Sequence, residues 1–174
     1  MNITDSDTII KFLSGNGTDH ILRTYSDMLE LNNFEMEKCH DQIQWLFPLH
    51  EFSKHARTCP ILNEETVEKA KEVEAVKSNL LRAKDRFERF LAIGDYEDID
   101  KQRKWCSKQN GRTNHNLLRV TRVIRCFRLF GLEDEAKDFY DKVVPVGDYF
   151  GVGEFTLNKW KQALTDNVWT TLQD

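Results

Sequence analysis

The 174-residue sequence predicts an all-α fold, built as a single compact multi-helix domain over residues 1–174. Apolar residues recur at spacings of three and four along most of the chain, which is the period of one buried helical face. Residues that favour helix starts precede these segments, and glycines follow several of them. We find no series of alternating apolar and polar residues that would predict strands. With 40% apolar and 31% charged residues, the chain has the composition of a globular protein.

Three helices are expected before residue 48. Asp5 or Ser6 can cap the first, and Gly15 follows its end. Thr18 can cap the second, and Asn33 can cap the third. The second helix has apolar residues at helical spacing, namely Ile21, Leu22, Tyr25, Met28 and Leu29.

The third helix leads into the most apolar stretch of the chain, residues 40–49, which we call the 40–49 segment. Its large apolar residues are neighbours in sequence, and such a run suits packing on more than one side. Pro48 disfavours helical dihedral angles at Phe47. We therefore expect the helix to end near Leu46 and the chain to continue as an extended segment. Trp45 and Phe47 are expected to anchor the core.

The helical period fails between residues 48 and 62, so we expect a loop that crosses the helices there. Asn63 can cap the longest predicted helix, which runs to Gly94. Its apolar residues follow at spacings of three or four. Residues 95–100 are expected to form an acidic connection.

The remaining chain predicts two helices before residue 131. Asp100 can cap a short helix that ends at Trp105. Thr113 or Asn114 can cap a longer helix that runs to Phe130 and is followed by a glycine.

Two further helices are expected near the C-terminal end of the sequence. The acidic residues 133–135 favour a helix start because they lie at the positive end of the helix dipole. Pro145 and the glycines after it predict a turn-rich link. A last helix is expected over residues 154–164.

Charge is unevenly distributed along the chain. Residues 101–128 contain nine basic residues and no acidic residue, so the rest of the chain carries −13 within a net charge of −4. Such a segment can attract an anionic partner, or it can pair with the chain's own acidic segments, 64–74 and 95–100. Both alternatives stay open. The candidate anion-binding residues are Arg112, His115, Arg119, Arg122, Arg125 and Arg128.

We expect no catalytic residue, no metal and no cofactor. His40 and Asp41 are adjacent, so they point about 100° apart on a helix, which suits capping or buried hydrogen bonds better than acid–base chemistry. The residues with zinc-binding atoms lack the close pairs of structural zinc sites; they are Cys39, His40, His50, His55 and Cys59. Phosphate-loop and serine-hydrolase motifs are absent from the sequence.

Targeting signals are also absent from the sequence. There is no secretory signal and no apolar run of transmembrane length. The four cysteines lie far apart, which favours free thiols in a reducing compartment. We expect a soluble, intracellular protein, cytoplasmic or, in a eukaryote, nuclear.

The 40–49 segment reads HDQIQWLFPL and resembles the HDYIQWLFPL motif of the opioid growth factor receptor family, with Gln42 in place of tyrosine. The stretch NHNLLRVTRVI at residues 114–124 resembles a second motif of the family. The similarity covers about residues 18–140 and leaves 141–174 as a C-terminal helical extension. The structural signature residues that the first motif identifies are His40, Asp41, Trp45, Phe47 and Pro48.

The resemblance implies an all-helical domain, and it does not imply an enzyme. For the vertebrate members it implies binding of an enkephalin-type peptide. Our leading hypothesis is an interaction domain that binds a peptide or protein partner. The alternative is a nucleic-acid or phosphate-binding module that uses the basic segment 101–128, and an enzyme with an unrecognised site is a third possibility.

Overall fold

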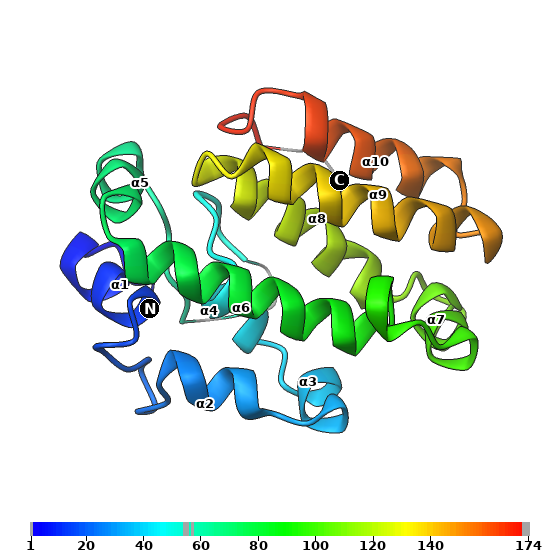
Figure 1. Ribbon diagram of the computed structural model, residues 1–174, viewed down its shortest axis with the longest axis horizontal. Coiled ribbons are helices and arrows are strands. Elements are labelled where there is room, and N and C mark those ends of the chain that lie inside the picture. The colour runs from blue at the N-terminus through cyan, green and yellow to red at the C-terminus, as the bar shows by residue number, and fades with distance from the viewer. Residues whose placement is uncertain (1, 54–55, 57, 172–174) are drawn as a thin grey trace. The chain divides into compact units, whose positions relative to one another are not determined.

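A computed structural model describes residues 2–53, 56 and 58–171 (Figure 1). Over these residues it contains ten α-helices, one short 3-10 helix and no β-strand, so the all-α prediction is confirmed. None of the described helices is long and apolar enough to cross a membrane. The chain divides into two compact units, and the single domain expected from the sequence stays a prediction. The first unit comprises residues up to 86 together with 129–131, and the second comprises residues 87–128 together with those from 132 onward.

Six helices begin in the first unit, and the last of them continues into the second. α1 packs against α5, and α2 lies against α4. Side-chain caps at Asp5, Thr24, Asn32 and Asn63 explain where four of these helices start. The helices are α1 (Ser6–Leu13), α2 (Tyr25–Glu30), α3 (Asn33–Lys38), α4 (Gln42–Leu46), α5 (Glu64–Lys71) and α6 (Glu74–Leu91).

The 40–49 segment folds as predicted in its main features. α4 ends at Leu46, and the chain after Pro48 is extended, with Leu49 bridged to Ile61. The Leu62 amide donates to the Leu49 carbonyl at 2.9 Å. Extended residues from distant parts of the sequence thus lie side by side without forming a sheet.

Three helix boundaries in the first unit differ from those predicted. The helix expected from Thr18 begins only at Tyr25, because Thr24 and Asp27 form a capping box there. The helix expected from a cap at Asn33 to about Leu46 is split into α3 and α4 at Cys39, and α3 is capped by Asn32 rather than by Asn33.

The long helix expected after Asn63 is also split, into α5 and α6. The chain turns at Glu72, where the Val73 amide bonds to the Ala70 carbonyl. Apolar residues keep their three-residue spacing across this turn, so the period gave no sign of the break.

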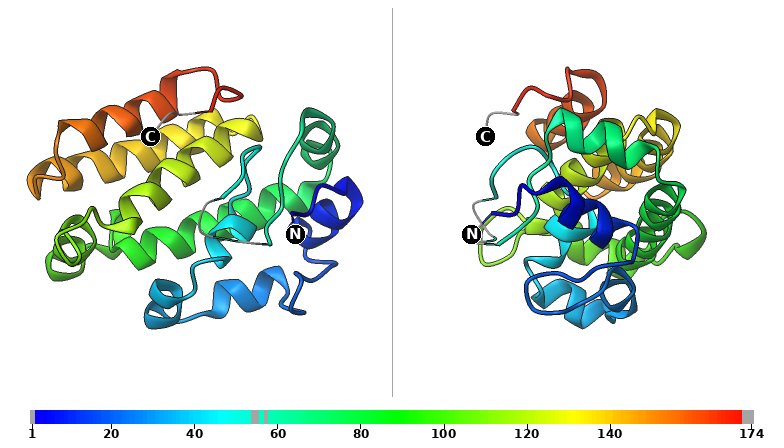
Figure 2. Two further views of the ribbon diagram at one scale, coloured as in Figure 1. Left: turned by 180° about the vertical axis from the view of Figure 1, so that it is seen from behind. Right: turned by 90° about the vertical axis from the view of Figure 1, so that its left-hand side faces the viewer.

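The second unit contains the C-terminal part of α6, the 3-10 helix η1 (Gly94–Tyr96) and four further helices. α9 and α10 form an antiparallel hairpin whose helices lie side by side in each view (Figure 2). Trp160 is fully buried, and its Nε1 donates to the Leu117 carbonyl at 3.1 Å. The four helices are α7 (Ile99–Cys106), α8 (His115–Leu129), α9 (Glu133–Tyr149) and α10 (Glu154–Thr165).

Helix starts in the second unit follow the sequence with small shifts. α7 is capped by Asp98, two residues before the cap that we predicted. Asn114 lies at the start of α8 as predicted, and its Oδ1 accepts from the Asn116 amide at 3.0 Å. α10 covers the last predicted helix and extends it by one residue.

The turn-rich link predicted from Pro145 onward is wrong for its first part, because α9 continues through this proline to Tyr149, and the turn occupies residues 150–153. Pro145 is exposed, and the helix tolerates its missing amide hydrogen. Gly147 has a packing role, since a Cβ atom there would lie 2.6 Å from Cζ3 of Trp160. The absence of a side chain at Gly147 therefore allows α9 and the Trp160 ring to approach closely.

We predict that Gly147→Ala destabilises the protein by about 1–3 kcal/mol, because the added methyl group overpacks the Trp160 contact. Urea unfolding measures this change. Pro145→Ala in the same helix is the matched control, and its expected effect is stabilising because it restores a helical donor. A Gly147→Ala variant as stable as the wild type would contradict the close approach.

Candidate functional site

Residues 18–24 form a closed loop before α2 that exposes two aliphatic side chains. Thr18 and Thr24 are bridged at its base, and the Asp19 amide donates to the Arg23 carbonyl at 2.8 Å. At the tip, Ile21 is 57% exposed and Leu22 is 81% exposed. Leu22 also has a φ of +69°, in the left-handed region that residues with a Cβ atom rarely adopt. The loop therefore exposes an apolar tip in a strained conformation.

Asp19 holds this loop from the inside. Its carboxylate is fully buried, and its Oδ1 accepts from the backbone amides of Ile21 at 3.0 Å and Arg23 at 2.8 Å. Its Oδ2 accepts from Nε of Arg23 at 2.7 Å and forms an ion pair with Nη2 of Arg23 at 2.6 Å. These bonds fix the backbone on both sides of Leu22, which compensates for the unfavourable dihedral angle.

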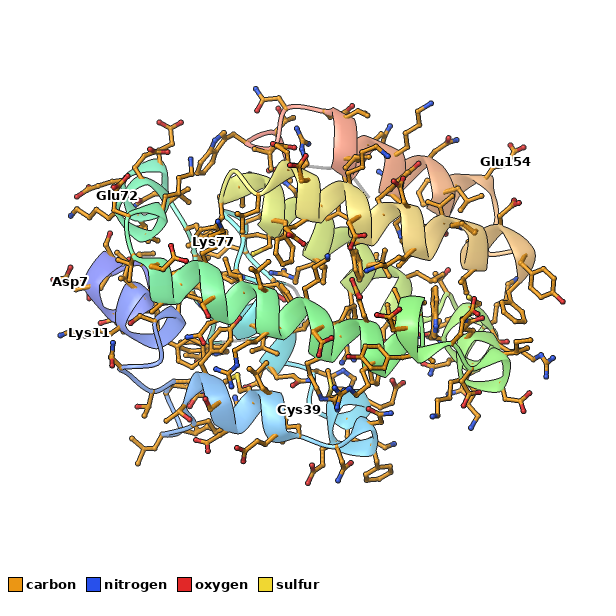
Figure 3. All side chains as sticks on the ribbon, viewed as in Figure 1. Asp7, Lys11, Cys39, Glu72, Lys77 and Glu154 are labelled. Carbon is orange, nitrogen blue, oxygen red and sulfur yellow. The ribbon has the colours of Figure 1, made fainter. Side chains whose placement is uncertain are left out.

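Arg23 connects the loop to the residues just before α4. Its Nη2 donates to Oδ2 of Asp41 at 2.8 Å, and its Nη1 lies 3.2 Å from Sγ of Cys39. The Cys39 thiol in turn donates to Oδ1 of Asp41 at 3.1 Å. Figure 3 shows Cys39 at the end of α3, where the chain turns toward α4. We call the group Asp19, Arg23, Cys39 and Asp41 the Arg23 clasp.

The clasp changes the pKa values of its members. Burial raises the pKa of Asp41, but hydrogen bonds from Arg23 and Cys39 and the charge of Arg23 outweigh it, so the pKa is lowered. Burial and the bond to Asp41 raise the pKa of the Cys39 thiol. For Arg23, burial lowers the pKa, but the bonds to Asp41 and Asp19 outweigh it and the pKa is raised. The charged pair is therefore stable at neutral pH, and Cys39 stays a thiol.

His20 attaches the same loop to the core. Its ring stacks on Trp45 with centroids 6.0 Å apart, and Trp45 also meets Phe12 edge-on at 4.7 Å. Nε1 of Trp45 donates to the Thr58 carbonyl at 3.2 Å. Of the signature residues, Trp45, Phe47 and Pro48 are buried as expected of core residues, whereas His40 is exposed.

The donor atoms near the clasp could hold a metal only by displacing Arg23. Asp19, His20 and Asp41 each offer a ligand atom, and these atoms lie within 4.8 Å of one another. The guanidinium of Arg23 already contacts both carboxylates, so it supplies the positive charge that an ion would bring. For the zinc ligands considered from the sequence, His55 lies outside the described residues.

The candidate anion-binding residues do not form one exposed surface. Arg119 and Arg125 are buried, Arg122 and Arg128 are partly buried, and Arg112 is exposed. Nη1 of Arg119 donates to Oδ1 of Asn116 at 3.1 Å. The nucleic-acid hypothesis for this segment stays a prediction, and the buried guanidinium groups lend it no support.

The C-terminal arginines of α8 bind carbonyls in the last turn of α10 and in the chain that follows it. Nη2 of Arg125 donates to the carbonyls of Val168 and Thr170 at 3.3 and 3.1 Å. Nη1 of Arg128 donates to the carbonyls of Ala163 and Asp166 at 2.9 and 2.7 Å. Burial, with the nearby charge of Arg128, lowers the pKa of Arg125 to about 10. The partners of Arg125 and Arg128 in these contacts are backbone carbonyls. The internal alternative for the basic segment is supported at its start, where Lys101 pairs with Asp98 at 3.2 Å and Arg103 with Asp100 at 3.1 Å, both in the acidic stretch 95–100.

Asn114 is the last residue before α8, and His115 is the first residue of that helix. Nδ1 of His115 is 3.1 Å from Oε1 of Gln109, and Nδ2 of Asn114 donates to the carbonyls of Lys104 and Ser107. Both side chains thus bind neighbouring residues of the same unit. The capping role predicted for Asn114 explains the bond that its Oδ1 accepts from the Asn116 amide, whereas its Nδ2 binds carbonyls at the end of α7 and just after it.

Sequence reasoning missed Asp19, Leu22 and Arg23 as site residues. Their role depends on Arg23 meeting Asp41, eighteen positions away, and no local pattern reveals that contact. One local signal was available: Thr24 and Asp27 have the spacing of a capping box, which places the preceding aliphatic pair outside the helix.

Comparison with known proteins adds one match. The family model described as the opioid growth factor receptor (OGFr) conserved region matches residues 12–143. This range contains the whole loop, the Arg23 clasp and the 40–49 segment. No curated protein and no solved structure matches the chain.

We predict that Asp41→Asn lowers the free energy of unfolding by about 1–3 kcal/mol at pH 7, because it removes the charge that binds Arg23. Since the folded-state pKa of Asp41 is lowered, its stabilisation is present above its unfolded-state value of about 3.9 and is lost as the pH falls through the folded-state pKa. The difference from wild type should therefore shrink with acidification.

Urea unfolding over a descending pH series measures this effect. Asp100→Asn is the matched control, because its pair with Arg103 is exposed and contributes less than about 1 kcal/mol. If Asp41→Asn lowers the free energy of unfolding by no more than Asp100→Asn does, the result counts against the clasp. So does a difference between Asp41→Asn and the wild type that stays the same at every pH.

Proposed function

The chain belongs to the opioid growth factor receptor family, and on this basis we propose that it is a non-enzymatic interaction domain that binds a peptide or protein partner. The observation that carries the proposal is Leu22, which is 81% exposed and has a left-handed backbone conformation. The proposed contact surface is the loop tip, Ile21 and Leu22.

Leucine at this position is unfavourable for the free protein in two respects. A left-handed conformation costs a residue with a Cβ atom about 1–2 kcal/mol, whereas asparagine and glycine adopt it more easily. The exposed side chain gains none of the roughly 1.5–3 kcal/mol that burial of a leucine provides. Burial against a partner supplies that energy and offsets the strain.

The loop is also rigid enough to act as a preformed contact. Asp19 binds the amides on both sides of Leu22, and Arg23 ties the loop to Asp41. A loop that is already ordered loses little conformational entropy on binding, which raises affinity for a given contact area.

The chemistry of the clasp supports a role without catalysis. The carboxylate of Asp19 accepts hydrogen bonds from two backbone amides and a guanidinium group. These bonds stabilise the loop and occupy the oxygens that a catalytic carboxylate would use. Burial and Asp41 raise the pKa of Cys39, and a protonated thiol is a poor nucleophile. The polar groups therefore position the apolar tip.

We predict that Leu22→Asn raises the stability of the protein by about 0.5–1 kcal/mol and removes partner binding. Asparagine relieves the left-handed strain but cannot fill an apolar pocket. Urea unfolding measures the stability arm. Leu118→Asn is the matched control, since Leu118 is an exposed leucine within α8, where asparagine is expected to cost a few tenths of a kcal/mol.

The binding arm uses a photoreactive amino acid placed at position 22, or at position 118, in extract of the cells that produce the protein. We expect a discrete cross-linked adduct from position 22 only. Excess unlabelled wild-type protein should suppress it, whereas excess Leu22→Asn should not. An enkephalin-type peptide is the first small competitor to test. The same adducts from both positions, or none from position 22, would refute the proposal.

A further inference from the structure

The chain between α7 and α8 forms a tight hairpin that carries exposed basic side chains. The amides of Gln109 and Arg112 each donate to the other residue's carbonyl at 2.9 Å, and the two residues form an antiparallel bridge. Asn110 and Gly111 form the turn between them, with φ values of +51° and +74°. Positive values at both central positions are typical of a type I′ turn, for which Asn-Gly is a preferred sequence. The hairpin is therefore determined locally.

Asn114 attaches this hairpin to the end of α7. Its Nδ2 donates to the carbonyls of Lys104 and Ser107, both at 3.1 Å. Because α8 starts directly after Asn114, both ends of the hairpin are anchored to helices of the second unit. A Cβ atom on Gly111 would have no neighbour within 4 Å, so the tip of the turn is sterically open. A ligand can thus approach a backbone that is already ordered.

Three exposed cations flank the hairpin. Lys104 lies in the last turn of α7, Lys108 lies just before the bridged pair, and Arg112 belongs to that pair. No acidic side chain in the part of the chain that the structure describes forms an ion pair with any of the three. Residues 101–128 also contain no acidic residue. The three charges are therefore available to an external anion.

The acidic residues nearest in sequence pair with other cations. Oδ2 of Asp98 is 3.2 Å from Nζ of Lys101, and Oδ1 of Asp100 is 3.1 Å from Nη1 of Arg103. These four charges cancel in pairs. The positive charge at the hairpin therefore comes from Lys104, Lys108 and Arg112 alone.

The uncharged side chains beside these cations identify the kind of anion. Between residues 103 and 113 no apolar side chain is exposed, since Trp105 and Cys106 are buried. A protein partner would need an apolar or aromatic centre, and a membrane-surface segment inserts apolar side chains. The exposed Asn110 and Thr113 carry hydrogen-bond donors of the kind that, with lysine and arginine, binds phosphate oxygens of nucleic acids. We call these residues the basic turn: Lys104, Lys108, Asn110, Arg112 and Thr113.

The lack of exposed rings in the basic turn favours a duplex over a single strand. Proteins that bind single strands combine cations with aromatic side chains on which the bases stack. A duplex keeps its bases stacked inside and exposes its phosphates, and the major groove of B-form DNA is wide enough for a two-stranded β-ribbon. A narrow hairpin with cations on both of its arms suits that surface.

We propose that the basic turn binds the phosphate backbone of double-stranded nucleic acid. Contacts to phosphates position a protein on a duplex but carry no sequence information, so the binding is independent of base sequence. Of the anion-binding residues considered from the sequence, the proposal keeps Arg112 and sets aside Arg119 and Arg125, which are buried. It is independent of the loop before α2.

Fluorescence anisotropy of labelled duplex DNA and duplex RNA over a salt series tests the proposal with the full chain. Each neutralised phosphate contributes about 0.9 to the fall of log affinity with log salt concentration, so three cations predict a slope of about −3. Lys104→Gln/Lys108→Gln/Arg112→Gln should weaken binding at low salt by about tenfold or more and bring the slope close to zero. Two duplexes of unrelated sequence should bind equally well.

The matched control removes three other exposed cations that have no ion pair with a described residue. Each is replaced by glutamine, so the net charge falls by the same amount, whereas the affinity and the slope should stay near those of the wild type. Circular dichroism checks that both triple variants are folded, as expected for substitutions of exposed side chains. The three control residues are Lys11, Lys77 and Lys161.

A wild-type chain that binds neither duplex at low salt would overturn the proposal. So would a loss of affinity in the control variant as large as that in the basic-turn variant, or tighter binding to a single strand than to a duplex of equal length. Tighter binding to polyglutamate or to anionic phospholipid vesicles through the same three cations would assign the surface to that partner and overturn the proposal as well. Binding to the DNA duplex, the RNA duplex or both supports it and identifies the source of the phosphates.

Discussion

The ion pair between Arg23 and Asp41 is the constraint on which the proposed interaction site depends. It joins a loop before α2 to the chain just before α4, and it does so with a partly buried guanidinium group that contacts two carboxylates. A buried carboxylate without a partner is strongly destabilising. Asp19 is therefore compatible with the fold only because Arg23 and two backbone amides satisfy it, and the loop geometry follows from that requirement.

An aromatic residue of the 40–49 segment packs against the loop that this ion pair holds. Trp45 packs against Phe12 and stacks on His20, whose neighbour Asp19 belongs to the clasp. Packing and electrostatics thus act on the same loop. This arrangement gives the 40–49 segment two roles: its apolar residues anchor the core, and Asp41 positions a surface loop.

Much of the fold could be predicted from sequence because its signals are local. Caps such as Asp5 and Asn63, and the proline after α4, depend on residues within one helical turn of the boundary. Some errors concern local signals that were overlooked, such as the capping box of Thr24 and Asp27 at the start of α2. Others arose where residues further along the chain decide. α9 continues through Pro145, and Gly147 lets that helix approach Trp160, which is thirteen positions further along the chain.

The candidate site was harder to predict than the fold. A leucine at helical spacing is predicted to be a core residue, whereas in the structure Leu22 has a positive φ and is exposed. The arginines of α8 illustrate the opposite error. Their spacing predicts a cationic face, but Arg119 and Arg125 are buried, because the helix contacts other segments on more than one side.

Amide hydrogen exchange measured by NMR tests most directly whether the clasp holds the loop. The amides of Ile21 and Arg23 donate to the buried Asp19 carboxylate and should exchange slowly in the wild-type protein. In Asp41→Asn they should exchange much faster, while amides within α10 keep their wild-type rates. Unchanged exchange at Ile21 and Arg23 in that variant would contradict the account, because the loop would then be ordered without the Arg23–Asp41 pair.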